Sequence, residues 1–218
     1  MTGVITIHDM PQRSQEWFEV RLGRVTGSIA SKYFNSYGKL KQSSVLQNNI
    51  SKQVAELLLG FNEDSQADTY DMARGREMED IALMDLYEKG YCDVGFVTNS
   101  NHPHFGVSPD AVFMDDQMAV TTGVEVKSPT SNYHTRYLLT KKVANDYKPQ
   151  IGLQFVLIPT IERVIFRSFN PSFEGKNKTL EIVIEREDWK DYLTNLENSM
   201  VKLGAIIDES VGKLKSEL

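Results

Sequence analysis

The 218-residue chain is 40% hydrophobic and 25% charged, as in ordinary water-soluble globular proteins, and we expect one domain over residues 1–218 with a polar tail over about 210–218. No apolar run is long enough to span a membrane, and the single cysteine, Cys92, excludes an internal disulfide framework, a cysteine-rich zinc finger and a four-cysteine iron–sulfur cluster. The net charge of −6 argues mildly against nucleic acid as a partner, although basic residues cluster locally over 13–24, 32–41 and 74–76.

Helical spacing of apolar residues, with a cap or a stop residue at the ends, recurs along the chain. In chain order, it predicts a short helix that Ser14 caps and Gly23 ends, a further helix start at Thr26 or Ser28, helices over 45–59, 72–89, 149–158 and 188–207, and a helical or irregular stretch over 131–148. Polar loops are expected over 35–44 and 61–71.

Short β-branched or aromatic runs between turn signals predict the strands. They lie at residues 94–98, 104–107, 111–114, 122–127, 164–169 and 180–185. Helices come first, then a cluster of strands, a helix, two strands and a last helix. This order indicates an α/β domain with a central mixed β-sheet flanked by helices.

The most informative segments are two extended ones that carry acids. Asp110 ends one extended segment, and Glu125-Val126-Lys127 follows it on a later one. Because side chains alternate along a strand, Glu125 and Lys127 share a face. Hard cations such as Mg²⁺ prefer carboxylate oxygens, and a neighbouring ammonium can orient or deprotonate a water. Such a site can cut phosphodiester bonds.

The acid-x-lysine triplet is not specific by itself, since it recurs at 146–148, 174–176 and 188–190, where a solvated surface pair is the simpler interpretation. The triplet at Glu125 differs because it lies in a β-branched strand between Gly123 and Pro129, and because Asp110 precedes it.

Two helices add polar side chains on apolar faces. Glu79 lies on the apolar side of the helix over 72–89, where a buried carboxylate needs a metal or a partner such as Arg74 or Arg76, unless it lies at the edge of the apolar stripe. Gln150 and Gln154 lie one turn apart in an apolar helix. Either glutamine can orient a metal-bound water or bind nearby backbone, and the sequence leaves both alternatives open.

Together these residues resemble the YqaJ-type viral recombinase nucleases, the family of phage lambda exonuclease. The matching segments occur in family order: Trp17, Arg21-Leu22-Gly23, Thr26-Gly27-Ser28, Gly75-Arg76-Glu77-Met78-Glu79, Ser108-Pro109-Asp110, Glu125-Val126-Lys127-Ser128-Pro129, Tyr147-Lys148-Pro149-Gln150, Asn170-Pro171 and Ile184-Glu185-Arg186.

The resemblance implies a restriction-endonuclease-like core and 5′→3′ degradation of one strand of linear double-stranded DNA. It implies dependence on Mg²⁺, with Mn²⁺ able to substitute and two ions bound, and a homotrimeric ring around DNA. The 3′ single-stranded tails would pass to a single-strand annealing protein for phage-type homologous recombination. With no signal peptide expected at residues 1–10, we expect a cytoplasmic protein, in the host cell cytosol if a phage encodes it.

The resemblance also implies roles for individual residues. Glu79, Asp110, Glu125 and the carbonyl of Val126 would hold metal, and Lys127 and Gln150 would place the attacking water. The remaining matches, which would bind DNA and its 5′-phosphate, are Arg21, Ser28 and Ser108.

Two departures from the family pattern stand out. A family Arg that reads the 5′-phosphate is missing near Asn132, so His134 or Arg136 is the candidate substitute. Gly152 occupies the place of a second family Gln, which leaves the role of Gln154 in doubt.

Two other functions remain open. A structure-specific or restriction-like DNA endonuclease could use the same core, and a non-catalytic DNA-binding recombination adaptor could have kept the fold. For Arg21, the alternative to phosphate binding is a surface ion pair with Glu16 or Glu19.

Overall fold

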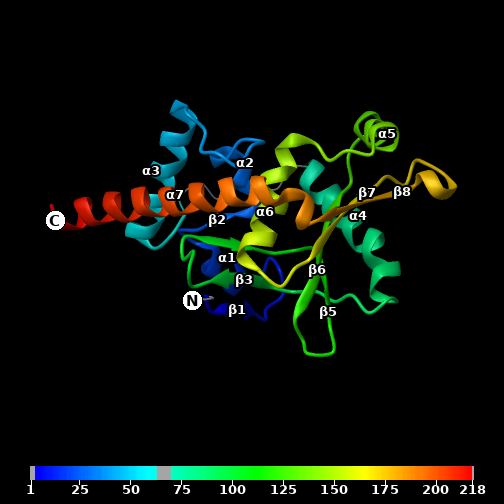
Figure 1. Cartoon of the computed structure of the whole chain (residues 1–218), viewed down its shortest axis with the longest axis horizontal. Coiled ribbons are helices and arrows are strands. Elements are labelled where there is room, and N and C mark those ends of the chain that lie inside the picture. The colour runs from blue at the N-terminus through cyan, green and yellow to red at the C-terminus, as the bar shows by residue number, and fades with distance from the viewer. Residues whose placement is uncertain (1–2, 63–69, 218) are drawn as a thin grey trace.

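The computed structural model describes residues 3–62 and 70–217, and in this part of the chain helices surround two four-stranded β-sheets (Figure 1). The first sheet has the order β1-β3-β4-β2, with parallel β2 and β4 and antiparallel neighbours elsewhere. Its strands are β1 (Ile5–His8), β2 (Val25–Thr26), β3 (Phe96–Asn99) and β4 (Phe105–Val107).

The second sheet has the order β5-β6-β7-β8, with parallel β6 and β7 at its centre and antiparallel pairs on either side. Its strands are β5 (Ala111–Met114), β6 (Val120–Lys127), β7 (Arg163–Phe169) and β8 (Thr179–Glu185). Both sheets are mixed, so the expected α/β architecture is confirmed, with the strands divided between two sheets.

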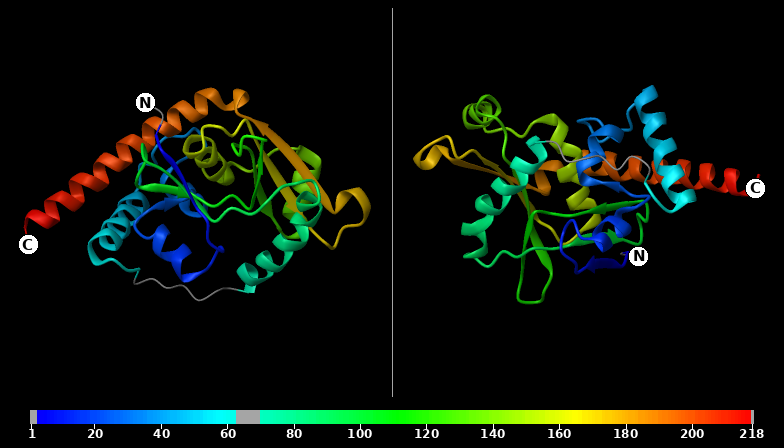
Figure 2. Two further views of the ribbon diagram at one scale, coloured as in Figure 1. Left: turned by 90° about the horizontal axis from the view of Figure 1, so that it is seen from below. Right: turned by 180° about the vertical axis from the view of Figure 1, so that it is seen from behind.

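The helices cover the sheets on several sides (Figure 2). They are α1 (Gln15–Arg21), α2 (Ala30–Tyr33), α3 (Ser44–Leu59), α4 (Tyr70–Tyr87), α5 (Ser131–Thr140), α6 (Lys148–Leu157) and α7 (Lys190–Ser216), with 3-10 turns η1 (Gly27–Ile29), η2 (Asn145–Tyr147), η3 (Gly175–Asn177) and η4 (Glu187–Trp189). Within the described residues, none of these helices combines the length and the apolarity that crossing a bilayer requires.

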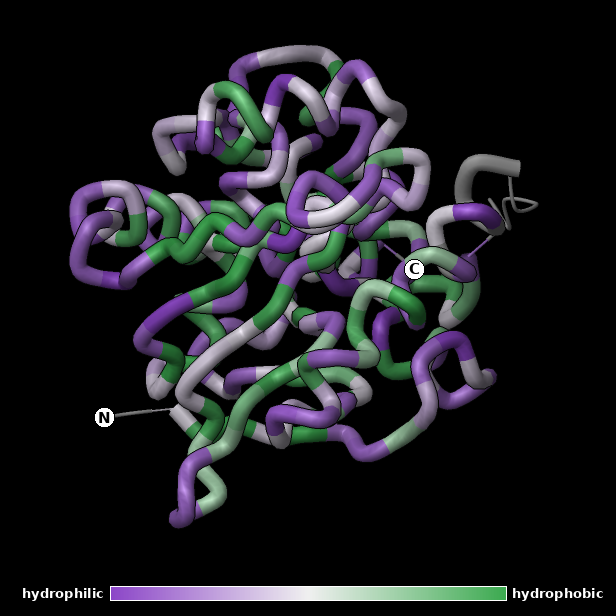
Figure 3. Tube along the Cα trace, turned by 90° about the vertical axis from the view of Figure 1, so that its right-hand side faces the viewer, coloured by the Kyte–Doolittle hydropathy of each residue, from purple (hydrophilic) through white to green (hydrophobic). Residues whose placement is uncertain are grey.

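Helix α6 is the central element, because it contacts β3 and β4 of the first sheet and β7 of the second. Proline at its first turn fixes a helical φ without losing an internal hydrogen bond. Its residues 151–157 are all buried, as expected for a helix that is apolar all round. The main core forms around it, and Figure 3 shows hydrophobic segments along the inner strands with hydrophilic ones in the outer loops.

A second, smaller core lies under α4. Ala82, Leu83 and Leu86 of that helix pack against β5, β6 and β7. The buried residues of those strands are Ala111, Val124, Val126, Ile165 and Phe169. This packing attaches α4, and with it Glu79, to the sheet that carries Glu125.

Three elements differ from the sequence-based expectation. Strands β1 and β2 were not predicted, because such short segments become strands only through pairing with β3 and β4. The last helix does not end at Ile207, and the tail expected over about 210–218 is helical to Ser216. The last fully buried residue of α7 is Ile207, and beyond it only Val211, among the described residues, packs against the core, at partial burial. Lys213 and Lys215 favour the helix C-terminus.

Candidate active site

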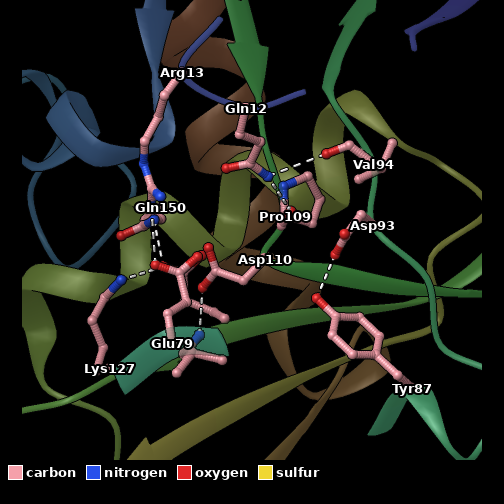
Figure 4. A network of polar contacts seen from close by, with 12 residues as sticks. Gln12, Arg13, Glu79, Tyr87, Asp93, Val94, Pro109, Asp110, Lys127 and Gln150 are labelled. Atoms are coloured by element: carbon pink, nitrogen blue, oxygen red, sulfur yellow. Dashed lines mark hydrogen bonds and ion pairs between the residues drawn. The ribbon is translucent and has the colours of Figure 1, made fainter. Parts of the chain in front are cut away.

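Glu125 is the centre of the candidate site, on the buried strand β6 between β5 and β7. Its side chain is 1% exposed, and every contact is a donor: Lys127 Nζ and Gln150 Nε2 (2.5 Å) on Oε1, and Gln154 Nε2 (2.9 Å) on Oε2. The shared face expected for Glu125 and Lys127 is thus confirmed by an ion pair. Figure 4 shows that the side chains of Lys127, Gln150 and Asp110 point toward one another.

Asp110 lies just before β5, where its Oδ2 accepts a 2.6 Å hydrogen bond from the backbone N–H of Val126. This contact joins the carboxylate to the strand segment that carries Glu125 and Lys127. Burial raises the pKa of Asp110, while Lys127 and the Val126 hydrogen bond oppose the rise.

Glu79 enters the same site from α4. Its Oε2 lies 3.3 Å from Nη2 of Arg13, a residue that sequence reasoning did not single out. Burial and the nearby carboxylate of Asp110 raise the pKa of Glu79 to about 7. The structure therefore supplies a partner from a distant segment; the proposed alternative Arg76 lies outside the described side chains.

Burial raises the pKa of Glu125 to about 8, and the carboxylates of Asp110 and Glu79 also disfavour its charged form. Burial disfavours the charged form of Lys127, but the carboxylates of Glu125 and Asp110 raise its pKa. A bound cation would lower the free energy cost of burying these carboxylates close together.

A divalent cation fits the chemistry of this donor set, which consists of carboxylate oxygens beside the backbone of Val126. Among the described residues, no three carboxylate, imidazole or thiol groups form a preassembled ligand cluster. Lys127, Gln150 and Gln154 donate to the two oxygens of Glu125. A cation would therefore compete with these donors for Glu125.

A cavity of about 200 Å³ is lined both by the acids and by basic side chains. The residues singled out from the sequence that line it are Arg21, Ser28, Glu79, Ser108, Asp110, Glu125, Val126, Lys127, Gln150 and Gln154. Gln12, Arg13, Trp17, Gly27 and Val107 complete its lining. Side chains from α1, α4, β6, α6 and the loops before β5 thus meet in one concave site.

Arg21 lies in this cavity with its guanidinium stacked 3.7 Å above the centre of the Trp17 ring. It donates a 3.2 Å hydrogen bond to Oγ1 of Thr26, and burial lowers its pKa to about 10. No carboxylate pairs with Arg21 in the part of the chain that is described, so the alternative surface pair with Glu16 or Glu19 is not formed.

Ser108 and Trp17 are held beside this arginine. Trp17 Nε1 donates to Oγ of Ser108 at 3.0 Å, and that hydroxyl donates to the carbonyl of Gly95 at 2.7 Å. Ser28 Oγ lies 3.3 Å from Oγ1 of Thr26. A stacked guanidinium with hydroxyls around it is suited to an anion such as a phosphate.

Arg136 and His134 lie elsewhere, on α5. Arg136 is exposed and does not line the cavity. His134 is fully buried, with Nε2 donating to the carbonyl of Asn177 at 2.7 Å and Nδ1 2.8 Å from Oγ of Ser168. Its ring therefore serves the packing of α5, and Arg136 as a DNA contact remains a prediction.

Gly152 faces α7 and not the acids, since a Cβ there would lie only 2.6 Å from Cδ2 of Leu196. A glutamine at 152 could not reach the site from this helix, whereas Gln154 does. Gln12, which sequence reasoning missed, donates 3.2 Å hydrogen bonds to the carbonyls of Val94 and Pro109 and holds the N-terminal segment over the site.

A family model described as YqaJ-like viral recombinase domain matches residues 16–157. No curated protein matches the chain significantly.

Three solved structures share the fold. An alkaline exonuclease from Laribacter hongkongensis has a TM-score of 0.78 at 24% identity, over 94% of this chain and 97% of that one. Its complex with dAMP has a TM-score of 0.72 at 24% identity, over 94% and 100%. A phage-related exonuclease from Haemophilus somnus has a TM-score of 0.52 at 11% identity, over 88% and 96%.

Proposed function

The chain belongs to the YqaJ-like viral recombinase family, and on that premise we propose that it is a Mg²⁺-dependent exonuclease that degrades the 5′-ended strand of linear double-stranded DNA. The 3′ tails that remain would serve phage-type homologous recombination. The proposal takes the reaction to be hydrolysis of a phosphodiester bond next to the end of the strand.

One juxtaposition supports the proposal above all. The buried Glu125–Lys127 pair and Arg21, which no described carboxylate neutralises, line the same cavity of about 200 Å³. An acidic centre is suited to a cation and to hydrolysis, and the arginine is suited to a phosphate that is not itself cleaved. A terminal 5′-phosphate beside a scissile phosphodiester is a substrate with both features.

In this proposal, Glu79, Asp110, Glu125 and the carbonyl of Val126 hold the metal, with two ions bound and Mn²⁺ able to replace Mg²⁺. When bound, the metal supplies positive charge that stabilises the phosphate and the leaving oxygen and makes a water more acidic. Lys127 and Gln150 both donate a hydrogen bond to Oε1 of Glu125. From there they can orient the attacking water, and Lys127 can take or return a proton.

The direction of digestion determines which bonds form and break in each hydrolysis step. The water oxygen bonds to the phosphorus, the bond from phosphorus to the 3′ oxygen of the terminal nucleotide breaks, and that oxygen takes a proton. The terminal nucleotide leaves as a 5′-monophosphate, and the shortened strand carries a new 5′-phosphate. The Laribacter exonuclease has been solved with dAMP, and we propose a deoxynucleoside monophosphate as the product here.

Arg21, Ser28 and Ser108 would hold the 5′-phosphate. Because each cleavage generates a new 5′-phosphate, the same clamp can engage the shortened strand, which would favour repeated cleavage on one DNA molecule. The family relationship further supports a homotrimeric ring around DNA and a single-strand annealing protein as the recipient of the 3′ tail, and sedimentation and co-purification experiments would test these two points.

Digestion of linear duplex DNA labelled on one strand at its 5′ end or its 3′ end tests the proposal. With Mg²⁺, the 5′ label should appear at once as a mononucleotide, while the 3′ label should stay in long DNA. A chelator should stop both. Early release of the 3′ label would show that digestion runs from the 3′ end and would refute the proposed 5′→3′ polarity.

Closed circular duplex separates the proposal from its rivals. An exonuclease that needs an end should leave the circle intact, whereas cutting of the circle would support the structure-specific or restriction-like endonuclease. Binding without cleavage of either substrate would support the non-catalytic adaptor.

A further inference from the structure

An ion-pair network joins β7 to helix α4 beneath the active site. Arg167 of β7 has a side chain that is 4% exposed. Its Nη1 and Nη2 donate to the two carboxylate oxygens of Asp85 at 2.5 Å and 2.8 Å, and Nη1 also donates to the carbonyl of Ala82. On the other side, Nε donates to Oε1 of Glu181 at 3.0 Å. The guanidinium thus contacts both the backbone and a side chain of α4.

The other attachment of α4 to the sheet is apolar. Ala82, Leu83 and Leu86 pack against the small core over β5, β6 and β7. Apolar burial is not directional, so it holds a helix against a sheet without determining its position along its own axis. A bidentate contact between a guanidinium and a carboxylate is directional, because two parallel hydrogen bonds define one geometry.

That position matters because Glu79 lies on the same helix, three residues before Ala82. A shift of α4 by one residue would move Glu79 by about 1.5 Å along the axis and turn it by about 100°. Arg13 does little to prevent this, since its side chain is 45% exposed and its contact with Glu79 is a single one of 3.3 Å. Arg167 is beside Val126 in the strand register, next to the residues that Glu79 faces across the cavity.

We propose that Arg167 is a positioning residue for Glu79: by its contacts with Ala82 and Asp85 it determines where α4 lies on the sheet, and hence where the Glu79 carboxylate lies among the acids. This inference rests on the proposed function for the role of Glu79, but the placement of the helix can be tested without cleavage.

The first experiment compares Arg167→Met with the wild type and with Arg163→Met. Arg163 is a matched control at the start of the same strand, where its exposed side chain lies 3.7 Å from Glu185 and does not reach α4. In Arg167→Met, the amides of α4 should exchange hydrogen for deuterium about tenfold faster or more in the absence of metal, while those of β6 and β7 stay protected. Arg163→Met should exchange like the wild type.

The second experiment measures Mn²⁺ binding by calorimetry and the cleavage rate at saturating metal. Displacement of a ligand by about 1 Å can cost on the order of 100-fold in rate, so we expect Arg167→Met to lose about tenfold or more in both quantities. Arg167→Lys keeps the charge but not the two-pronged geometry, and we expect it to recover folding stability without recovering the rate.

A double-mutant cycle with Glu79→Gln separates positioning from general damage. If Arg167 acts through Glu79, then Arg167→Met should add little to the loss already caused by Glu79→Gln. Independent, additive losses, or an Arg167→Met protein with wild-type α4 exchange and Mn²⁺ affinity, would overturn the inference. Should Arg167→Met fail to fold, Arg167→Lys carries the same comparisons.

Failure of the proposed function would look different. A wild type that cleaves no DNA, with faster α4 exchange and weaker Mn²⁺ binding in Arg167→Met, would refute the exonuclease and retain the positioning role. If the wild type cleaves DNA and Arg167→Met equals it in α4 exchange, Mn²⁺ affinity and cleavage rate, the exonuclease is retained and the positioning role is refuted.

Discussion

Gln154 donates a 2.9 Å hydrogen bond from Nε2 to Oε2 of Glu125, and both residues are buried. The amide oxygen of Gln154 has no hydrogen-bond partner within the described part of the chain, so this glutamine leaves one polar atom unsatisfied. A leucine would avoid that penalty. Glutamine at position 154 is therefore explained by its hydrogen bond to the Glu125 carboxylate and not by the packing of α6.

Replacement of Gln154 by leucine should lower both activity and stability. The change leaves Oε2 of Glu125 buried without a donor, which costs about 1–3 kcal/mol in the free energy of unfolding. Urea unfolding and single-turnover cleavage measure the two effects. Gln47→Leu, at an exposed position of α3, is the control and should be close to wild type in both. An unchanged cleavage rate in Gln154→Leu would show that Glu125 does not need this donor.

Lys127→Ala should nearly abolish cleavage and leave DNA binding intact. Loss of a preorganised cation at the reacting centre costs about 100-fold or more in rate, or about 3 kcal/mol. DNA binding should persist because Arg21 is untouched. Lys142→Ala, which removes an exposed lysine after α5, is the control for general loss of positive charge. A folded Lys127→Ala protein that cleaves at the wild-type rate would remove Lys127 from the mechanism.

Asp110→Asn and Glu125→Gln should each weaken Mg²⁺ binding by about tenfold or more, because each removes a negative charge from an oxygen-rich site. The metal-free variants should be as stable as the wild type or more stable, since repulsion among the acids is relieved. Calorimetric titration and thermal unfolding without metal give the two readouts. Asp116→Asn, exposed in the turn between β5 and β6, serves as the control. Unchanged affinity in both site variants would refute the metal assignment.

Arg21→Ala should erase a preference for 5′-phosphorylated ends. Arg21 is stacked on Trp17 and has no described carboxylate partner, so its charge is available for a phosphate. The measurement is the initial digestion rate of paired duplexes that differ only in the 5′-phosphate, for wild type, Arg21→Ala and Arg136→Ala. Loss of the preference in Arg136→Ala alone would move the clamp to α5, and a wild type that treats both ends equally would mean that no clamp is used.

The Asp85–Arg167 contact should give a pH-dependent stability. Hydrogen bonds from Arg167 lower the pKa of Asp85 to about 2, from an ordinary value of 3.8. Because the folded-state pKa is the lower one, the contact stabilises the protein above pH 3.8, and this contribution is lost as the pH falls through about 2. Solvent screening keeps it small, since the Asp85 side chain is 51% exposed.

We expect Asp85→Asn to lower the free energy of unfolding near neutral pH and to lower it by less at about pH 3. Urea unfolding of both proteins at several pH values measures this difference. A difference that does not change with pH would mean that the carboxylate charge is not what stabilises the contact.

The sequence by itself determined the features that depend on neighbours in the chain. Alternation along a strand predicted that Glu125 and Lys127 share a face, and helical periodicity predicted that Gln150 and Gln154 do. Both features follow from backbone geometry over two to four residues, which tertiary contacts do not alter. The same holds for most helix and strand bounds, with the end of the last helix as an exception, since α7 continues to Ser216 and not to about Ile207.

Only the tertiary structure decided which segments meet. Arg13 was found to pair with Glu79, and among the described residues Arg21 was found without an ion pair to the acids on its own helix. Arg167 reaches α4 across more than eighty residues of sequence, as its hydrogen bond to Ala82 shows. Charge pairs of this kind leave no local pattern, because any exposed acid can pair with any arginine until the packing of helices on the two sheets selects one.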